Sequence, residues 1–279
     1  MANSYTEVES TARTYYNSGD ADAFYFHVWG GEDIHVGIYQ HSEESIFSAS
    51  RRTVEKMSSY LENVDPTKQI LDIGAGYGGS ARFLSEKFSC KVDCLNISEE
   101  QNARNRNLNK ERKLDGLVKV IDGSFEEIPS EDACYDIVWS QDAILHSGKK
   151  EKVFQEVSRV LKPGAEFIFT DPMQSKDAKK EELKPVLERI HLESMGYFEY
   201  YEDLGRKYGL SLIQKVDLTE NLIRHYTRIL EEVTKRYEEL TNGICSKDYM
   251  DRMKQGLNAW IKAGESGNLN WGILHFKKV

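Results

Sequence analysis

The chain has 279 residues, with 37 lysines and arginines against 46 aspartates and glutamates, so its formal net charge is −9. A hydrophobic content of 39% is enough for a sizeable core and excludes a wholly disordered chain. The acidic balance argues against a nucleic-acid partner, because the overall field does not attract phosphate backbones. The four cysteines form no C-x-x-C pair, and the chain shows neither a secretory signal nor an apolar stretch of the roughly 20 residues that span a bilayer. We therefore expect a cytoplasmic protein without a membrane partner.

The first 65 residues predict a layer of helices. Tyr15 and Tyr16 lie in the first of them, and a second begins near Ser18, a good N-cap residue, and ends at Gly30. A third begins at about Ser42 and carries apolar residues at helical spacing.

Strands and helices alternate after Pro66. Apolar runs predict strands over residues 69–73, 91–96, 117–121, 135–139, 166–170, 210–216 and 271–276. Such alternation is typical of crossover units and of a parallel sheet that is covered on both faces. We therefore predict an α/β fold, a Rossmann-like, doubly wound, mostly parallel seven-stranded sheet, with helical insertions near the C-terminus at about 174–208 and 219–263.

A glycine-rich turn, Ile70-Leu-Asp-Ile-Gly-Ala-Gly-Tyr-Gly-Gly79, follows the first strand. Gly74 and Gly76 permit a tight turn and the close approach of a ligand to the backbone. Asp72 ends the strand, where it would repel a pyrophosphate and attract a cationic amino-acid group. Asn96 ends the next strand about 20 residues later, at the position of a ribose-binding residue. A purely structural turn without a ligand is the alternative.

These motifs, with Ile121-Asp-Gly-Ser-Phe125 and Tyr135-Asp-Ile-Val-Trp-Ser-Gln-Asp142 in order behind them, resemble the class I S-adenosylmethionine-dependent methyltransferases. The resemblance implies S-adenosylmethionine as methyl donor, S-adenosylhomocysteine as product, and no metal. Asn96 departs from the acidic residue that much of the superfamily has there, and Asp122 matches the residue that binds the adenine amine. The donor-binding residues implied in this way are Ile34, His35, Asp72, Gly74, Gly76, Asn96, Ile97, Gln101, Asp122, Gly123, Ser124 and Gln141.

Two further segments narrow the resemblance. Residues 141–146, Gln-Asp-Ala-Ile-Leu-His, resemble a segment of the phosphoethanolamine methyltransferases, and residues 26–37 resemble the lid of glycine, sarcosine and dimethylglycine methyltransferases. Over its whole length the chain is similar to the sarcosine/dimethylglycine N-methyltransferases, which make betaine. This implies a lid over residues 1–65 and a methyltransferase domain over 66–279.

The activity that we expect is the N-methylation of sarcosine and dimethylglycine to glycine betaine, with a small-molecule amine as the acceptor. Methylation of phosphoethanolamine or another small amine is the nearest alternative. An NAD-dependent dehydrogenase and a non-catalytic protein that binds the donor belong to different classes. The oligomeric state, monomer or homodimer, stays open.

His146 is the predicted catalytic base. An alkyl amine with a pKa near that of lysine, about 10.4, must lose a proton before it attacks a methyl group, and a histidine with a pKa of about 6.5 can take it. Tyr16 is the predicted partner of His146, and Asp142, four residues before His146, is expected to orient the amine. A helix-capping or backbone-bonding role for His146 is the alternative.

The acceptor requires two further features. A quaternary ammonium product favours aromatic neighbours, for which Trp29, Tyr16 and Tyr39 are the candidates, although each could simply pack a helix. A substrate carboxylate needs a cation, and Arg189 and His191 lie in a segment that resembles the acceptor-binding segment of the phosphoethanolamine enzymes. A surface position on a helix is the alternative for Arg189.

Overall fold

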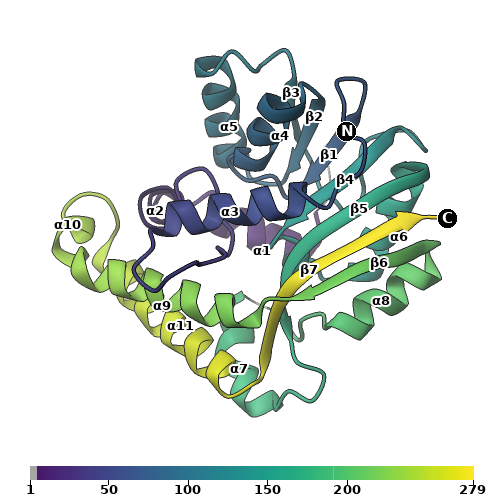
Figure 1. The fold of residues 1–279 in the computed structure, drawn as a ribbon. Coiled ribbons are helices and arrows are strands. Elements are labelled where there is room, and N and C mark those ends of the chain that lie inside the picture. The colour runs from purple at the N-terminus through teal and green to yellow at the C-terminus, as the bar shows by residue number, and fades with distance from the viewer. Residues whose placement is uncertain (1–4, 191) are drawn as a thin grey trace.

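The sheet of the computed structural model, which describes residues 5–190 and 192–279, has seven strands in the order β3-β2-β1-β4-β5-β7-β6 (Figure 1). Five neighbouring strands are parallel, namely β3 (Val118–Asp122), β2 (Lys91–Asn96), β1 (Gln69–Ile73), β4 (Tyr135–Gln141) and β5 (Leu161–Gln174). β7 (Leu269–Lys278) is antiparallel to both of its neighbours, β5 and β6 (Leu210–Asp217). The strand order reverses between β1 and β4, where α/β sheets open a crevice for ligands at the carboxyl ends of the strands.

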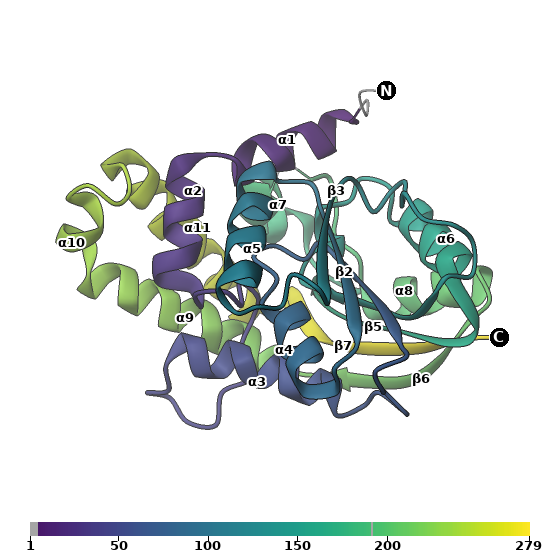
Figure 2. The same ribbon diagram turned by 90° about the horizontal axis from the view of Figure 1, so that it is seen from above.

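Helices cover both faces of this sheet (Figures 1 and 2). α3 (Ile46–Ser58), α4 (Gly79–Phe88) and α5 (Glu99–Glu111) lie on one face, and α6 (Lys150–Val160) and α8 (Phe198–Lys207) on the other. The core on the α6 side is rich in aromatic rings, with Phe154 packed against Phe167 and Tyr201. Burial on both faces explains why the central strands β1, β4 and β5 carry long apolar runs.

A second group of helices stands beyond the carboxyl ends of the parallel strands. It comprises α1 (Glu7–Tyr16), α2 (Gly19–Phe24), the π-helical turn η1 (Tyr25–Trp29), α7 (Lys180–Ile190), α9 (Thr219–Lys235), α10 (Tyr237–Thr241) and α11 (Lys247–Glu265). Most of these helices share a core that includes Phe24, Trp29, Leu257 and Trp260. The η1 turn near the N-terminus packs against α9, so residues distant in sequence build this layer.

The predicted fold class is confirmed, and the differences are local. The charged stretch at 176–208 forms two helices, of which α7 packs on α11 while α8 covers the sheet. The third helix begins at Ile46, because the side chain of Ser45 accepts the N-terminal hydrogen bond from Ser48. The division into a lid and a domain at residue 65 stays a prediction. Within the described parts of the chain, no helix is both long and apolar enough to cross a membrane.

Candidate active site

A cavity with an empty volume of about 700 Å³ lies at the carboxyl ends of the first four strands. We call it the donor cavity. Most of the residues predicted for the methyl donor line it, namely Ile34, Gly74, Gly76, Asn96, Ile97, Gln101, Gly123, Ser124 and Gln141.

The glycines of the turn leave this cavity open. Gly74 has a φ of +76° and Gly76 a φ of +52°, both in the left-handed region that favours glycine. A Cβ atom on Gly74 would lie 2.2 Å from the Cβ of Ala143, and one on Gly76 would lie 3.1 Å from Ile34. A side chain at Gly74 would therefore collide with the loop that follows β4.

One predicted donor residue does not reach the cavity. Asp122 is exposed and lines neither the donor cavity nor its extension, because its carboxylate accepts hydrogen bonds from Arg106 and from Asn102 Nδ2 (2.8 Å), both on α5. Glu9 of α1 is buried at this end of the cavity instead, where it accepts hydrogen bonds from the hydroxyl of Ser124 and the backbone of Thr6. Glu9 was not predicted from the sequence, because it lies far along the chain from the motif that contains Ser124.

A narrow extension of the cavity holds buried acidic and amide groups, and His35 also lines it. Asp72 is 3% exposed, and burial, reinforced by the nearby charge of Asp33, raises its pKa to about 7. No ion pair among the described residues involves Asp72. The Nε2 of Gln141 is buried there without a hydrogen-bond partner in the described residues. A ligand with an ammonium and a polar acceptor fits these groups, as the amino-acid end of S-adenosylmethionine does.

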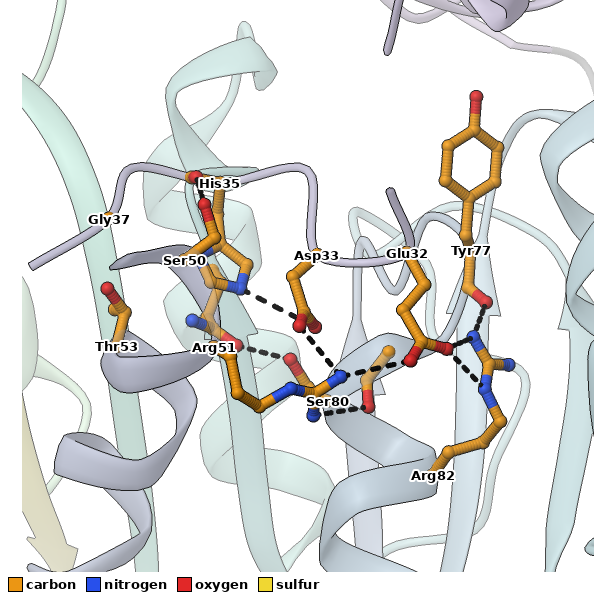
Figure 3. Close-up of polar contacts among 12 residues, drawn as sticks. Glu32, Asp33, His35, Gly37, Ser50, Arg51, Thr53, Tyr77, Ser80 and Arg82 are labelled. Atoms are coloured by element: carbon orange, nitrogen blue, oxygen red, sulfur yellow. Dashed lines mark hydrogen bonds and ion pairs between the residues drawn. The ribbon is translucent and has the colours of Figure 1, made fainter. Parts of the chain in front are cut away.

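Residues 30–38, which we call the strap, are held to α3 and α4 by polar contacts (Figure 3). Arg51 of α3 holds Asp33 at 2.7 Å and Glu32 at 3.1 Å, and Arg82 of α4 holds Glu32 at 2.6 Å. The carbonyl oxygen of His35 accepts a hydrogen bond of 3.0 Å from the Ser50 hydroxyl. These contacts fix the strap, and Ile34 on it lines the donor cavity and a second, neighbouring cavity.

This second cavity, which we call the acceptor cavity, has an empty volume of about 710 Å³. It shares Ala12, Tyr16, Ile34, Asp142 and His146 with the donor cavity. The three residues predicted to be catalytic thus lie where the two cavities meet. A ligand in the donor cavity and a ligand in the acceptor cavity would therefore meet beside these three side chains.

Tyr16 and His146 form a direct pair at this junction. The Tyr16 hydroxyl lies 2.9 Å from His146 Nε2. Burial lowers the pKa of His146 to about 4, and the positive charges of Lys150 and Arg189 act in the same direction. Burial raises the pKa of Tyr16. At neutral pH the imidazole is therefore uncharged, and its Nε2 shares a hydrogen bond with the tyrosine hydroxyl.

Asp142 connects three elements at the same place. Its φ is +51°, and its carboxylate accepts hydrogen bonds from Trp271 Nε1 of β7 (2.8 Å) and from the backbone N–H of Val36 in the strap (2.6 Å). Burial raises its pKa to about 6. Two donors therefore hold the carboxylate between the strap and the sheet, so it is not free to turn toward a ligand.

Comparisons with known proteins agree with this architecture. Residues 71–169 match a family model described as a methyltransferase domain. The sarcosine/dimethylglycine N-methyltransferase of Halorhodospira halochloris is 51% identical over 96% of this chain and 96% of its own length. The chain belongs to the sarcosine/dimethylglycine N-methyltransferase family. The family member of Aphanothece halophytica is 48% identical over 97% of this chain and 98% of its own.

Solved structures share the fold of this sarcosine/dimethylglycine N-methyltransferase family member. A Galdieria sulphuraria protein whose proposed activity is that of a sarcosine dimethylglycine methyltransferase has a TM-score of 0.89 and 45% identity over 95% of this chain and 98% of its own. Phosphoethanolamine N-methyltransferase 2 of Haemonchus contortus, in complex with S-adenosylmethionine, has a TM-score of 0.84 over 98% of this chain and 60% of its own, at 19% identity, which shows the fold alone. The family predicted from the sequence is confirmed.

The acceptor cavity of this family member differs from the prediction in its aromatic lining. Trp29 lines it as expected, but Tyr39 does not, because the Tyr39 hydroxyl is bonded to His225 Nδ1 of α9 at 2.9 Å. His191 lies outside the described residues. The aromatic residues that the sequence reading missed are Tyr15, Tyr25, Tyr226 and Trp260. They come from α1, η1, α9 and α11, and no local motif joins those elements.

Arg189 lines this cavity and lacks a carboxylate partner among the described residues. Its polar contact there is from Nη2 to the sulfur of Met253, at 2.8 Å. Burial alone would lower the pKa of Arg189, and the phenol groups around it, those of Tyr15 and Tyr25 first, raise it. A guanidinium has five N–H donors, so an inward-facing arginine with one weak acceptor is suited to an anionic ligand.

Proposed function

We propose that the chain transfers a methyl group from S-adenosylmethionine to the nitrogen of sarcosine and of dimethylglycine, yielding glycine betaine. Arg189 carries the choice of acceptor, because its guanidinium has no carboxylate partner among the described residues and lines an aromatic cavity that adjoins the donor cavity. A small zwitterion with a carboxylate at one end and a methylated amine at the other matches that combination of charge and aromatic surface.

The donor side is arranged for a cationic ligand. The sulfonium supplies a methyl group that is already electrophilic. Gly74 and Gly76 leave room along the backbone, Asn96 and Gln101 lie where a ribose would be bound, and Asp72 offers a buried carboxylate to the ammonium group. Asp122 was predicted to contact the adenine amine. We assign this contact instead to the end of the cavity that Glu9 and Ser124 line.

His146 and Tyr16 act on the acceptor nitrogen. An amine that arrives protonated must release its proton to expose the lone pair. Because burial lowers the pKa of His146 to about 4, below the 6.5 of a free histidine, the imidazole takes that proton only transiently and passes it on, with the Tyr16 hydroxyl beside it. Asp142 positions the strap at the same junction through Val36. Holding amine and methyl group in line is the remaining contribution, and the two adjoining cavities supply it.

Arg189 holds the carboxylate, and the aromatic rings surround the methylated nitrogen. Trp29, Tyr25 and Tyr226 are buried side chains of the acceptor cavity. A cation against such rings gains roughly 0.5–2 kcal/mol, and this gain is largest for the quaternary product and the protonated tertiary amine.

An acceptor panel tests this proposal. Purified protein is incubated with methyl-labelled donor and, separately, with glycine, sarcosine, dimethylglycine, phosphoethanolamine and dimethylethanolamine. We expect label on sarcosine and dimethylglycine, and none on dimethylethanolamine, which lacks the carboxylate. Turnover of phosphoethanolamine without turnover of sarcosine would contradict the proposal. Tight nicotinamide binding would favour a dehydrogenase instead.

Other sequence predictions stay predictions. These are the cytoplasmic location, the absence of a nucleic-acid partner, the oligomeric state and the movement of residues 1–65 as a lid.

A further inference from the structure

The turn that carries His146 is bridged by a buried lysine. η2 (Ile144–His146) is a short 3-10 turn between β4 and α6, and Lys150 is the first residue of α6. The Lys150 ammonium donates hydrogen bonds to the carbonyl oxygens of Leu145 (3.1 Å) and Ser147 (2.8 Å), the two residues that flank His146. Lys150 is 8% exposed and lines neither the donor cavity nor the acceptor cavity. It can therefore affect the reaction only indirectly, through the turn or through its charge.

The other polar groups of the turn are also occupied. The backbone N–H of Leu145 donates to Asp171 Oδ1 (2.9 Å), and the Ser147 hydroxyl donates to Glu126 Oε1 (2.7 Å). Asp171 is fully buried and accepts a second hydrogen bond from the hydroxyl of Tyr201. With the backbone on both sides of His146 held in this way, the imidazole has a defined direction toward Tyr16.

Helix stability does not explain this lysine. A positive charge in the first turn of a helix lies at the wrong end of the helix dipole, so Lys150 is unfavourable for α6. Burial of an ammonium group is costly as well, and burial indeed lowers the pKa of Lys150, although the carboxylates of Asp171 and Glu126 oppose that effect. An apolar residue at this position would avoid both the unfavourable interaction with the helix dipole and the cost of burying a charge. The benefit of Lys150 must therefore lie in the carbonyl groups that it binds and in its charge.

We propose that Lys150 is a positioning residue, whose ammonium holds the 144–147 turn so that His146 faces Tyr16 and whose charge keeps a second positive charge off the imidazole. The inference rests on the proposed role of His146 as the base. The charged and titratable groups around His146 and its turn are Glu9 and Tyr16 on α1, Asp142 before the turn, Glu126 after β3, Lys150 on α6, Asp171 on β5 and Arg189 on α7. Of these, Lys150 and Arg189 favour the neutral imidazole.

Lys150→Met tests the inference, with Lys152→Met as the matched control. Lys152 lies on the same helix but is only partly buried, and its ammonium pairs with Glu156 at 3.5 Å. For each variant, kcat and KM for dimethylglycine are measured against pH, donor Kd is measured by calorimetry, and the imidazole of His146 is titrated by NMR, with His146→Asn assigning its signal.

Lys150→Met should lower kcat at least tenfold and leave donor Kd within twofold, because the lysine lines neither the donor cavity nor the acceptor cavity. The His146 titration and the acid limb of kcat should both move to higher pH, since loss of a neighbouring positive charge favours the imidazolium. Lys150→Arg keeps the charge and should hold both near their wild-type pH. Lys152→Met should match the wild type throughout.

An unchanged His146 titration in Lys150→Met would overturn the inference, even if kcat and Tm fell, because that pattern describes a structural lysine. Should Lys150→Met fail to fold, Lys150→Gln, which keeps donors but loses the charge, is compared with Lys150→Arg in the same titration. The titration needs no turnover. Full activity of His146→Asn would therefore refute the proposed base and leave the effect of Lys150 on the imidazole separately measurable.

Discussion

Substitution of Arg189 by methionine should separate acceptor recognition from stability. Methionine fills a similar volume beside Met253 and the tyrosines but has neither charge nor N–H donors. Among the described residues the guanidinium contacts the Met253 sulfur and no carboxylate, so most of its hydrogen-bonding capacity is available to a ligand. The variant therefore removes contacts to substrate while it removes few contacts within the protein.

The two effects have opposite signs. A charge-assisted hydrogen bond contributes about 1.5–3 kcal/mol, so loss of a bidentate contact should cost about 3 kcal/mol, or roughly a 100-fold rise in KM for dimethylglycine. An inward-facing cation without a carboxylate partner is costly in the free protein, and its replacement by an apolar side chain should raise the free energy of unfolding by about 2 kcal/mol. For a chain of this size that corresponds to a Tm increase of roughly 4–8 °C.

The assays are initial-rate kinetics with dimethylglycine, calorimetric titration of the donor, and urea unfolding of the ligand-free protein. Arg252→Met, at an exposed position of α11, is the matched control and should change none of these quantities. A KM within threefold of the wild type would refute the carboxylate-binding role. A fall in unfolding free energy would instead make Arg189 a packing residue of the helical layer.

Three further predictions concern the donor cavity and the proton. Gly74→Ala should weaken donor binding more than 100-fold and lower Tm, because the new Cβ lies 2.2 Å from Ala143 in a left-handed turn. Adding Ala143→Gly to this variant should recover part of the lost affinity. Equal calorimetric Kd values for the single and the double variant would contradict the geometry. Donor affinity should fall about tenfold per pH unit below about pH 7, because Asp72, with its pKa raised to about 7 by burial, must lose a proton before it can bind an ammonium group. Calorimetry in buffers of different ionisation enthalpy should detect the released proton. Asp72→Asn should abolish this proton release. Tyr16→Phe should lower kcat roughly tenfold and leave donor Kd within twofold, since it deletes the 2.9 Å hydrogen bond to His146, which is worth about 1 kcal/mol or somewhat more. An unchanged single-turnover rate constant would exclude the pair from proton transfer.

The sequence was informative where the physics is local. The apolar runs that alternate with helices predicted the parallel sheet, because strand burial and helix periodicity are written over a few residues. Gly74 and Asp72 were recognisable since a tight turn and a strand-end carboxylate are features of one short segment. His146 was found next to Tyr16 because each belonged to a motif.

Other residues depend on contacts between segments distant in the chain. Asp122 reads as a donor-binding residue in its motif, yet Arg106 and Asn102 on α5 hold its carboxylate away from the cavity, and Glu9 of α1 lies there instead. The aromatic acceptor cavity comes from four elements that meet only when the helical layer folds. Arg189 was predicted from the resemblance of its segment, but only the fold shows that it lines the acceptor cavity and pairs with no carboxylate of the described residues. Charge neutralisation and burial are properties of the whole assembly of neighbours, so the tertiary structure alone decides them.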